Sequence, residues 1–253
     1  MKHPLYSCVR TGMRGIFLLA FLIILASCDN SENNPVAKVD LIFQLQYDGE
    51  PLAGSNEVYE LNDSVELQFS KVSFYLSDFK LSDGSQTYPL WDVLHISFLQ
   101  DINGDAIPET QQKLTFEIPS GNYESLSFGL GLHPTLNGTT PSEHEVGSAL
   151  SFTSEYWPAW QSYIFEKIEG AYKVNGGQLQ SVALHVGGDD TYRVLEWSSG
   201  LSIDDGEVKV INIPIDLKHI LDGYPITESA VLHQLEQLPL MEMIADRFVS
   251  SMN

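Results

Sequence analysis

Val39-Asp-Leu-Ile-Phe-Gln-Leu-Gln-Tyr47 is the stretch that decides the fold class. Every odd-numbered residue in it is apolar, and Asp48-Gly49 follows it as a turn signal. Alternation with a period of two is the pattern of a strand that buries one face and exposes the other. The stretch therefore predicts a half-buried strand that ends in a tight turn.

Similar runs recur along most of the chain. They are rich in β-forming residues, end at turn residues, and lie at 64–69, 71–81, 90–99, 113–118, 123–132, 178–186 and 207–215. A series of about eight to ten strands with turns between them is typical of an antiparallel sandwich or barrel. We therefore expect an all-β protein, built as an antiparallel β-sandwich.

Two segments depart from this period. Residues 133–155 have no period and are rich in Pro, Gly, Ser and Thr, as is usual for a loop that is functional or disordered. Between Leu232 and Phe248 the apolar residues recur at helical spacing, with Pro239 among them. Because proline breaks a helix interior, one or two short helices are expected to cap the sandwich.

The first 27 residues resemble a bacterial lipoprotein signal peptide. Basic residues precede an apolar run at 15–26, too short to span a bilayer, and Leu25-Ala-Ser-Cys28 follows as a lipobox. In such a signal the cysteine is acylated. An ordinary signal peptide with a chance cysteine is the alternative. We expect residues 1–27 to be the signal, 28–38 a lipid-anchored tether and 39–253 one domain.

Composition then excludes several classes of function. Cys8 leaves with the signal and Cys28 carries lipid, so thiol catalysis, disulfides and cysteine-based metal sites are excluded. The formal charge is −21, or −24 without the three basic residues of the signal. Nucleic acid is not an expected partner, because phosphate binding needs a basic surface. The membrane is expected to be reached through the lipid alone.

Histidines are the candidate metal ligands, because imidazole suits copper and zinc. His133 and His144 lie in the irregular segment, whereas His185 lies in a predicted strand. Their spacing forces no site, so a surface position for the first two and a core position for His185 form the alternative. Trp157 and Trp160 lie three residues apart, and packing in the hydrophobic core is the alternative to a functional role for them.

A weak calcium candidate lies between two predicted strands. Asp101, Asn103 and Asp105 place oxygen ligands at alternate positions, as in the first half of a calcium loop. The glycine, Gly104, stands at the fourth position rather than the sixth, and Gln112 stands where a bidentate glutamate would close the loop. A solvated hairpin turn around Asn103-Gly104 is the alternative.

Several segments, in order, resemble the copper-binding MbnP-like family, which is named after a periplasmic protein of methanobactin operons. They lie at 74–81, 116–123, 128–131, 136–137, 157–170, 184–187 and 244–248. The resemblance implies a periplasmic β-sandwich that binds copper. In related proteins a tryptophan is oxidised to kynurenine by a di-haem cytochrome c peroxidase-like partner and then lies at a copper site with histidines.

Carried over to this chain, the resemblance implies roles for particular residues. Trp157 and Trp160 match the tryptophan pair, with Trp157 the preferred candidate for oxidation, and His185 matches the strand histidine. Gly138 follows Asn137 where a loop histidine is expected, so His133 or His144 would take that part. Two residues separate the tryptophans here, where the family commonly has one.

Together these observations predict a non-catalytic copper-binding lipoprotein of the bacterial outer membrane, facing the periplasm or the cell surface. The alternative is a structural or ligand-binding surface lipoprotein that has no metal site. A hydrolase is a third reading, although the sequence contains no Gly-Xaa-Ser-Xaa-Gly elbow and no phosphate-binding glycine loop.

Overall fold

The computed structural model describes residues 36–55, 57–99, 109–198 and 200–252. The strands are β1 (Val36–Tyr47), β2 (Glu50–Pro51), β3 (Tyr59–Asn62), β4 (Val65–Ser82), β5 (Thr87–Phe98), β6 (Gln111–Pro119), β7 (Gly121–Tyr123), β8 (Ser125–Leu130), β9 (Tyr156–Trp157), β10 (Ser162–Val174), β11 (Gln180–Gly187), β12 (Arg193–Trp197), β13 (Leu201–Ile203), β14 (Val208–Asp216) and β15 (Val231–Leu232). The α-helices are α1 (Pro134–Asn137), α2 (Leu217–Leu221) and α3 (Leu238–Ser251), and the short 3-10 turns are η1 (Pro141–Glu143), η2 (Ala149–Ser151), η3 (Thr153–Glu155), η4 (Asp189–Thr191) and η5 (Leu235–Gln237).

Strand β1 lies in the smaller of the two main sheets, between β14 and β6. Its alternating apolar side chains are buried, as the sequence predicts: Ala37, Val39, Leu41, Phe43, Leu45 and Tyr47. It pairs with β6 antiparallel but with β14 parallel. The prediction of a purely antiparallel sandwich is therefore incomplete. The two parallel partners are far apart in the chain, so no tight hairpin dictates their direction.

The larger sheet has the order β12-β8-β4-β10-β11-β15, with β3, β5 and β9 joined to it. Its central strand β4 unites the two runs that the sequence places at 64–69 and 71–81. The last pair, β11 and β15, is again parallel. Strand β10, which the alternation did not reveal, is buried on both faces from residue 162 to residue 168.

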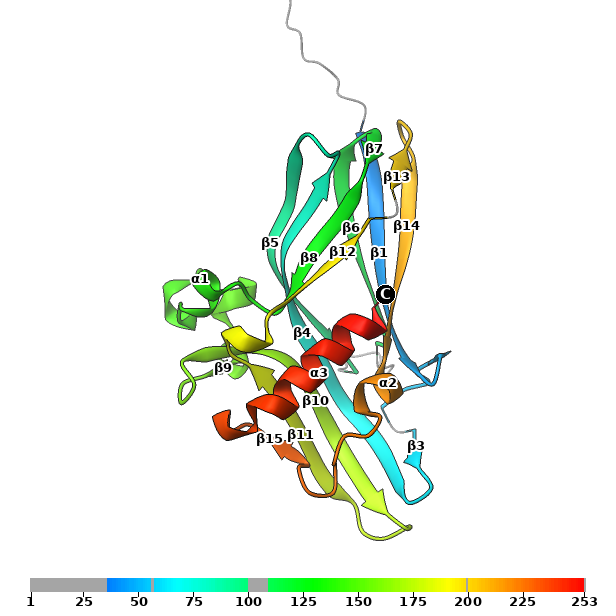
Figure 1. Ribbon diagram of the computed structural model, residues 1–253, viewed down its shortest axis with the longest axis vertical. Helices are drawn as coiled ribbons and strands as arrows, with labels where there is room; N and C mark the ends of the chain where they lie inside the picture. The colour runs from blue at the N-terminus through cyan, green and yellow to red at the C-terminus, as the bar shows by residue number, and fades with distance from the viewer. Residues whose placement is uncertain (1–35, 56, 100–108, 199, 253) are drawn as a thin grey trace, which may run out of the picture. The chain divides into compact units, whose positions relative to one another are not determined.

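The two sheets pack face to face, and the all-β sandwich is thereby confirmed (Figure 1). Phe43 of β1 lies against Phe74 of β4 and Phe128 of β8, with ring centroids 6.1 and 6.2 Å apart. Tilted aromatic pairs at such distances add to the stabilisation by burial. The core between the sheets therefore depends on the odd-numbered residues of β1.

Helix α3 covers the same core from one side, crossing the strands in Figure 1 and contacting β11, β12 and β14. Met241, Ile244, Ala245 and Phe248 form its buried stripe. Pro239 does not interrupt the helix, because it lies in the first turn, where a missing N–H costs nothing. Before Leu238 the apolar spacing belongs to β15 and η5, so the helix is shorter than the pattern suggests.

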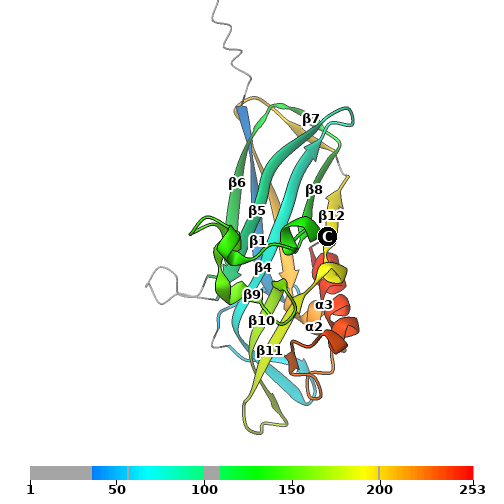
Figure 2. The same ribbon diagram turned by 90° about the vertical axis from the view of Figure 1, so that its left-hand side faces the viewer.

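The segment at 133–155 lies over the outer face of the larger sheet, in front of β4 and β10 in Figure 2. It forms α1 and three 3-10 turns rather than one irregular loop. The hydroxyl of Tyr75 donates to the carbonyl of Ala149 at 2.9 Å, and that of Tyr163 donates to the carbonyl of Leu150 at 2.8 Å. These bonds and a small apolar cluster that includes Leu132 and Phe165 fasten the segment to the sheet.

Candidate functional site

Trp157 lies at the start of a short hairpin at the edge of the larger sheet. Strand β9 pairs antiparallel with the start of β10, so that Trp157 is opposite Ser162. The tip between them exposes Pro158, Ala159 and Gln161, and Gln161 adopts a positive φ of 53°. The hairpin therefore presents Trp157 near the surface while its base is held by sheet hydrogen bonds.

His185 and His233 are brought to the same hairpin by strand pairing. In the parallel pair of β11 and β15, Leu184 is opposite Leu232, and both leucines point into the core. His185 follows Leu184 within β11, and His233 follows Leu232 directly after the end of β15. Because side chains alternate along a strand, both imidazoles leave the sheet on the face away from the core.

The four rings form a group that we call the histidine–tryptophan cluster: Trp157, Trp160, His185 and His233. Trp157 is central. Its ring centroid lies 5.3 Å from that of His233, 5.4 Å from that of Trp160 and 6.1 Å from that of His185. The rings of Trp157 and His233 are stacked, with 21° between their planes. All four side chains are half-buried.

The two tryptophans have different surroundings. Trp160 packs against the main hydrophobic core, and its ring lies so close to Gly187 that a Cβ there would approach it within 3.2 Å. The core interpretation of Trp160 is therefore supported. Trp157 instead has two imidazole rings among its neighbours, those of His185 and His233.

His185 makes one hydrogen bond where it could make two. Its Nε2 lies 2.8 Å from Oε1 of Glu169, and this hydrogen bond lowers the pKa of the glutamate. A carboxylate oxygen can only accept, so Nε2 is the donor. Nδ1 is buried and has no hydrogen-bond partner among the described residues. Buried polar atoms are normally paired, and an exception requires an explanation.

The donor set suits a metal that binds imidazole and accepts few protein ligands. In the part of the chain that the structure describes, no three His, Cys, Asp or Glu residues are grouped so as to hold a metal ion. The available protein nitrogens are Nδ1 of His185 and the ring nitrogens of His233. A zinc site that needs four protein ligands is not assembled here.

Two of the three histidines predicted as ligands lie elsewhere. His133 is exposed, and its Nδ1 accepts a hydrogen bond from the Thr135 amide at the start of α1. Nε2 of His144 lies 2.6 Å from Oγ1 of Thr139. The ring neighbours of Trp157 in the described structure are Trp160, His185 and His233. The structure thus brings His185 to the tryptophans, but it does not gather His133, His144 and His185 into one site.

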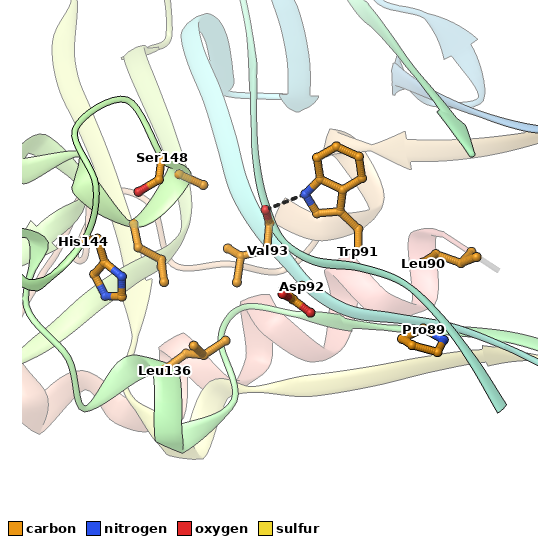
Figure 3. Close-up of a pocket in the computed structure, with 10 residues that line it drawn as sticks. Pro89, Leu90, Trp91, Asp92, Val93, Leu136, His144 and Ser148 are labelled. Carbon is orange, nitrogen blue, oxygen red and sulfur yellow. Dashed lines mark hydrogen bonds between the residues drawn. The ribbon is translucent and has the colours of Figure 1, made fainter. Parts of the chain in front are cut away.

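His144 faces a shallow pocket of about 580 Å³ beside strand β5. Figure 3 shows His144, Leu136 and Ser148 on one side of it and the strand residues from Pro89 to Val93 on the other. Trp91 donates its Nε1 proton to the carbonyl of Val93 over 3.1 Å. None of the residues that line this pocket belongs to the histidine–tryptophan cluster. Cys28 and the calcium candidates Asp101, Asn103 and Asp105 lie outside the described residues.

A second polar group, which we call the Glu155 cluster, surrounds Glu155, the residue directly before β9. It contains Glu155, Lys71, Lys167 and His95, all largely buried. Glu155 lies 2.9 Å from Nζ of Lys71 and 2.6 Å from Nζ of Lys167. Burial opposes its charge, but the two ammonium groups lower its pKa to about 2. Burial lowers the pKa of His95 to about 4.

His233 is the residue of the cluster that sequence reasoning missed. It follows a strand of two residues, which is too short to show alternation. The signal that could have found it is the pair Val231-Leu232 before a histidine, which matches Ala183-Leu184 before His185. That likeness becomes meaningful only once the two strands are known to run parallel.

Comparisons with known proteins identify the fold and the family of this chain. A search of curated proteins found no match. Among solved structures, MbnP from Methylosinus trichosporium matches with a TM-score of 0.52 and 13% identity, over 73% of this chain and 77% of that chain, which supports the fold. No helix in the described residues is long and apolar enough to cross a membrane. The MbnP family model matches residues 36–235, and the chain therefore belongs to the MbnP family.

Proposed function

We propose that this protein is a non-catalytic, lipid-anchored copper-binding protein of the bacterial cell envelope, with its metal site in the histidine–tryptophan cluster. The observation that carries the proposal is the buried Nδ1 of His185, which has no protein partner and lies on the ring that contacts Trp157. His233, whose ring stacks on the same indole, supplies the second imidazole.

Copper is favoured over the other common metals by the kind and number of donors. At a site of given nitrogen ligands, copper(II) is bound more tightly than zinc(II). Calcium and magnesium instead require clustered oxygen ligands. Within the described residues, Glu169 is the one carboxylate in hydrogen-bond contact with either imidazole, and its Oε1 accepts from Nε2 of His185. Two imidazole nitrogens from the protein are fewer than the four ligands of a structural zinc site, which favours copper over zinc.

We assign the third ligand to Trp157 after oxidation by a di-haem cytochrome c peroxidase-like partner. Two peroxide molecules would each give one oxygen atom and leave as water, cleaving the C2–C3 bond of the indole to N-formylkynurenine. Hydrolysis would then release formate and leave kynurenine. The indole offers only an N–H donor, whereas kynurenine has an amine and a ketone oxygen. Trp157 is preferred to Trp160 because it lies beside both histidines.

Anchoring is assigned to Cys28, on the strength of the lipobox and the run before it. One acyl chain gives only marginal membrane binding, so more than one chain is expected. Mass spectrometry of the N-terminal peptide tests this assignment. An unmodified Cys28, or a mature protein that starts elsewhere, contradicts it.

The metal assignment is tested by titrating the soluble domain with Cu(I) against a chromogenic chelator. The wild type is expected to bind one copper ion, and His185→Ala and His233→Ala to lower the affinity at least about tenfold while remaining folded in thermal melts. His219→Ala is the matched control, because His219 is exposed and bonded to Ser250 away from the cluster. Unchanged copper affinity in His185→Ala contradicts the proposal and favours a surface lipoprotein without a metal site.

Peptide mass spectrometry tests the assignment of the oxidised residue. Protein produced together with its haem partner is expected to carry a mass change at Trp157, with Trp91, Trp160 and Trp197 unchanged. Protein produced without the partner is the control. Unmodified masses at Trp157 in both preparations would remove the oxidation step and leave the two histidines as the proposed site.

A further inference from the structure

We propose that Glu169 is a positioning residue, which fixes the proton of His185 on Nε2 so that the buried Nδ1 is left as the metal-binding nitrogen. The inference rests on the proposed copper site, and it concerns a property of the protein that exists before any metal binds. Glu169 acts through His185 rather than as a ligand.

The first step is the hydrogen bond itself. Nε2 of His185 and Oε1 of Glu169 are 2.8 Å apart, which is a short, charge-assisted distance. If Nε2 carried no proton, its lone pair would face the carboxylate oxygen, and the contact would be repulsive. A neutral imidazole has one ring proton, so placing it on Nε2 leaves a lone pair on Nδ1.

The second step is the direction in which each nitrogen points. The Glu169 side chain is 34% exposed, whereas that of His185 is 13% exposed. The proton-bearing nitrogen therefore faces a carboxylate at the edge of the solvent. The other nitrogen is fully covered and has no hydrogen-bond partner in the described part of the chain. This is the arrangement in which metal-binding histidines are commonly held by a carboxylate on the far nitrogen.

The third step is the backbone that holds Glu169 in place. In the pairing of β10 with β11, Glu169 is opposite Ala183 and Lys167 is opposite His185, so the glutamate reaches the imidazole diagonally. On its other side the register of β10 with β4 shifts between Glu169 and Gly170. Such a bulge redirects a side chain. A Cβ at Gly170 would collide with the carbonyl of Gln68, so glycine permits this close approach.

The experiment compares Glu169→Ala with Glu169→Gln. Alanine removes the acceptor, whereas glutamine keeps an amide oxygen that can accept from Nε2 without the charge. Glu66→Ala is the matched control, because Glu66 has a similar exposure of 33% and pairs with Lys173 rather than with a histidine. Nitrogen-15 NMR of histidine-labelled, metal-free protein at pH 8 reports which nitrogen of His185 carries the proton.

The wild type, the glutamine variant and the control are expected to show the proton on Nε2 alone. The alanine variant is expected to show a mixture of both forms and a Cu(I) affinity about 10- to 100-fold weaker. Thermal melts verify that each variant is folded. A proton on Nδ1 in the metal-free wild type overturns the inference, and so does full copper affinity in the alanine variant. If the wild type binds no copper, the proposed function fails, while the NMR result still decides the role of Glu169.

Discussion

The Glu155 cluster and the histidine–tryptophan cluster both lie beside strand β10, and they differ in what compensates their buried polar atoms. Oε2 of Glu155 makes no hydrogen bond but lies 2.6 Å from the ammonium group of Lys167, whereas Nδ1 of His185 has no such charge beside it among the described residues. Lys167 belongs to the first, and Glu169, two residues further on, binds His185 of the second. In the Glu155 cluster the carboxylate has ammonium groups at 2.9 and 2.6 Å. In the histidine–tryptophan cluster, His185 has one partner and a second, buried nitrogen without one.

The difference separates a structural role from a binding role. Charges that neutralise one another inside a protein fix geometry, and here they fix the segment that leads into Trp157. An unpartnered nitrogen contributes nothing to folding, because it loses its bond to water and gains none in return. Its presence beside two tryptophans and a second histidine is explained if a ligand completes it. The expected outcomes below test this contrast.

The largest expected effect is on folding, from Glu155→Ala. The substitution leaves Lys71 and Lys167 as buried charges without the carboxylate that pairs with them directly, so the free energy of unfolding is expected to fall by roughly 3–5 kcal/mol. Urea denaturation measures it. Glu117→Ala is the control, because Glu117 forms an exposed ion pair with Lys38, and its loss is expected to cost about 1 kcal/mol or less. Equal effects of the two substitutions would contradict the structural role of Glu155.

Acid is expected to weaken the Glu155 cluster in two stages. His95 has a pKa of about 4, below its ordinary value of 6.5, so the unfolded chain takes up its proton first as the pH falls from 6.5 to 4. Glu155 has a pKa of about 2, below 4.5, so its contribution is present above pH 4.5 and is lost as the pH falls toward 2. Urea midpoints between pH 8 and pH 3 follow both stages. His95→Gln is expected to abolish the upper stage, and an unchanged profile would contradict the assignment.

Glu166, also in β10, is a third buried polar group, and its side chain lies on the opposite face of the strand from those of Lys167 and Glu169. It is fully buried, neither carboxylate oxygen has a hydrogen-bond partner, and burial raises its pKa against the opposing charge of Arg193. The folded protein therefore holds this proton more tightly than the unfolded chain, and stability is lost as the pH rises above about 4.5. Glu166→Gln is expected to raise the melting temperature at pH 7.5 and to have less effect at pH 4. A lower melting temperature at pH 7.5 would contradict this.

The smallest expected effects are those of His133→Ala and His144→Ala. Neither ring contacts Trp157 in the structure described, so Cu(I) affinity is expected to stay within about twofold of the wild type. Losing the His133 cap of α1 is expected to cost about 1 kcal/mol or less. Copper titration and thermal melts measure both. A large loss of copper affinity in either variant would move the metal site to the segment at 133–155.

Local pattern predicted the strands that bury one face. The alternation of residues 39–47 recovers most of β1, and Asp48-Gly49 marks its C-terminal end, but the strand already begins at Val36, inside the predicted tether. Strand β10 was not predicted, because Tyr163, Ile164 and Phe165 are all buried and leave no alternation to detect. Parallel pairing of β1 with β14 was also beyond reach, since the direction of a distant strand leaves no mark on either sequence.

The candidate site was predictable only where a local sequence pattern marks its residues. Trp157 and His185 lie in segments with recognisable composition, and the structure brings them together. His233 reaches them through a parallel pair of only two residues, which is a property of the tertiary fold. The loop histidines were plausible because a long segment can reach many places, but hydrogen bonds to Thr135 and Thr139 hold them elsewhere.

The most direct test of the central claim is to locate copper by anomalous diffraction in crystals of the Cu(I)-loaded domain, with data collected on both sides of the copper absorption edge. The account predicts a single anomalous peak within about 2.2 Å of Nδ1 of His185, with a nitrogen of His233 as a second ligand and residue 157 beside it. A peak at His133 or His144, or a His185 whose Nδ1 remains free while copper is bound elsewhere, would contradict it.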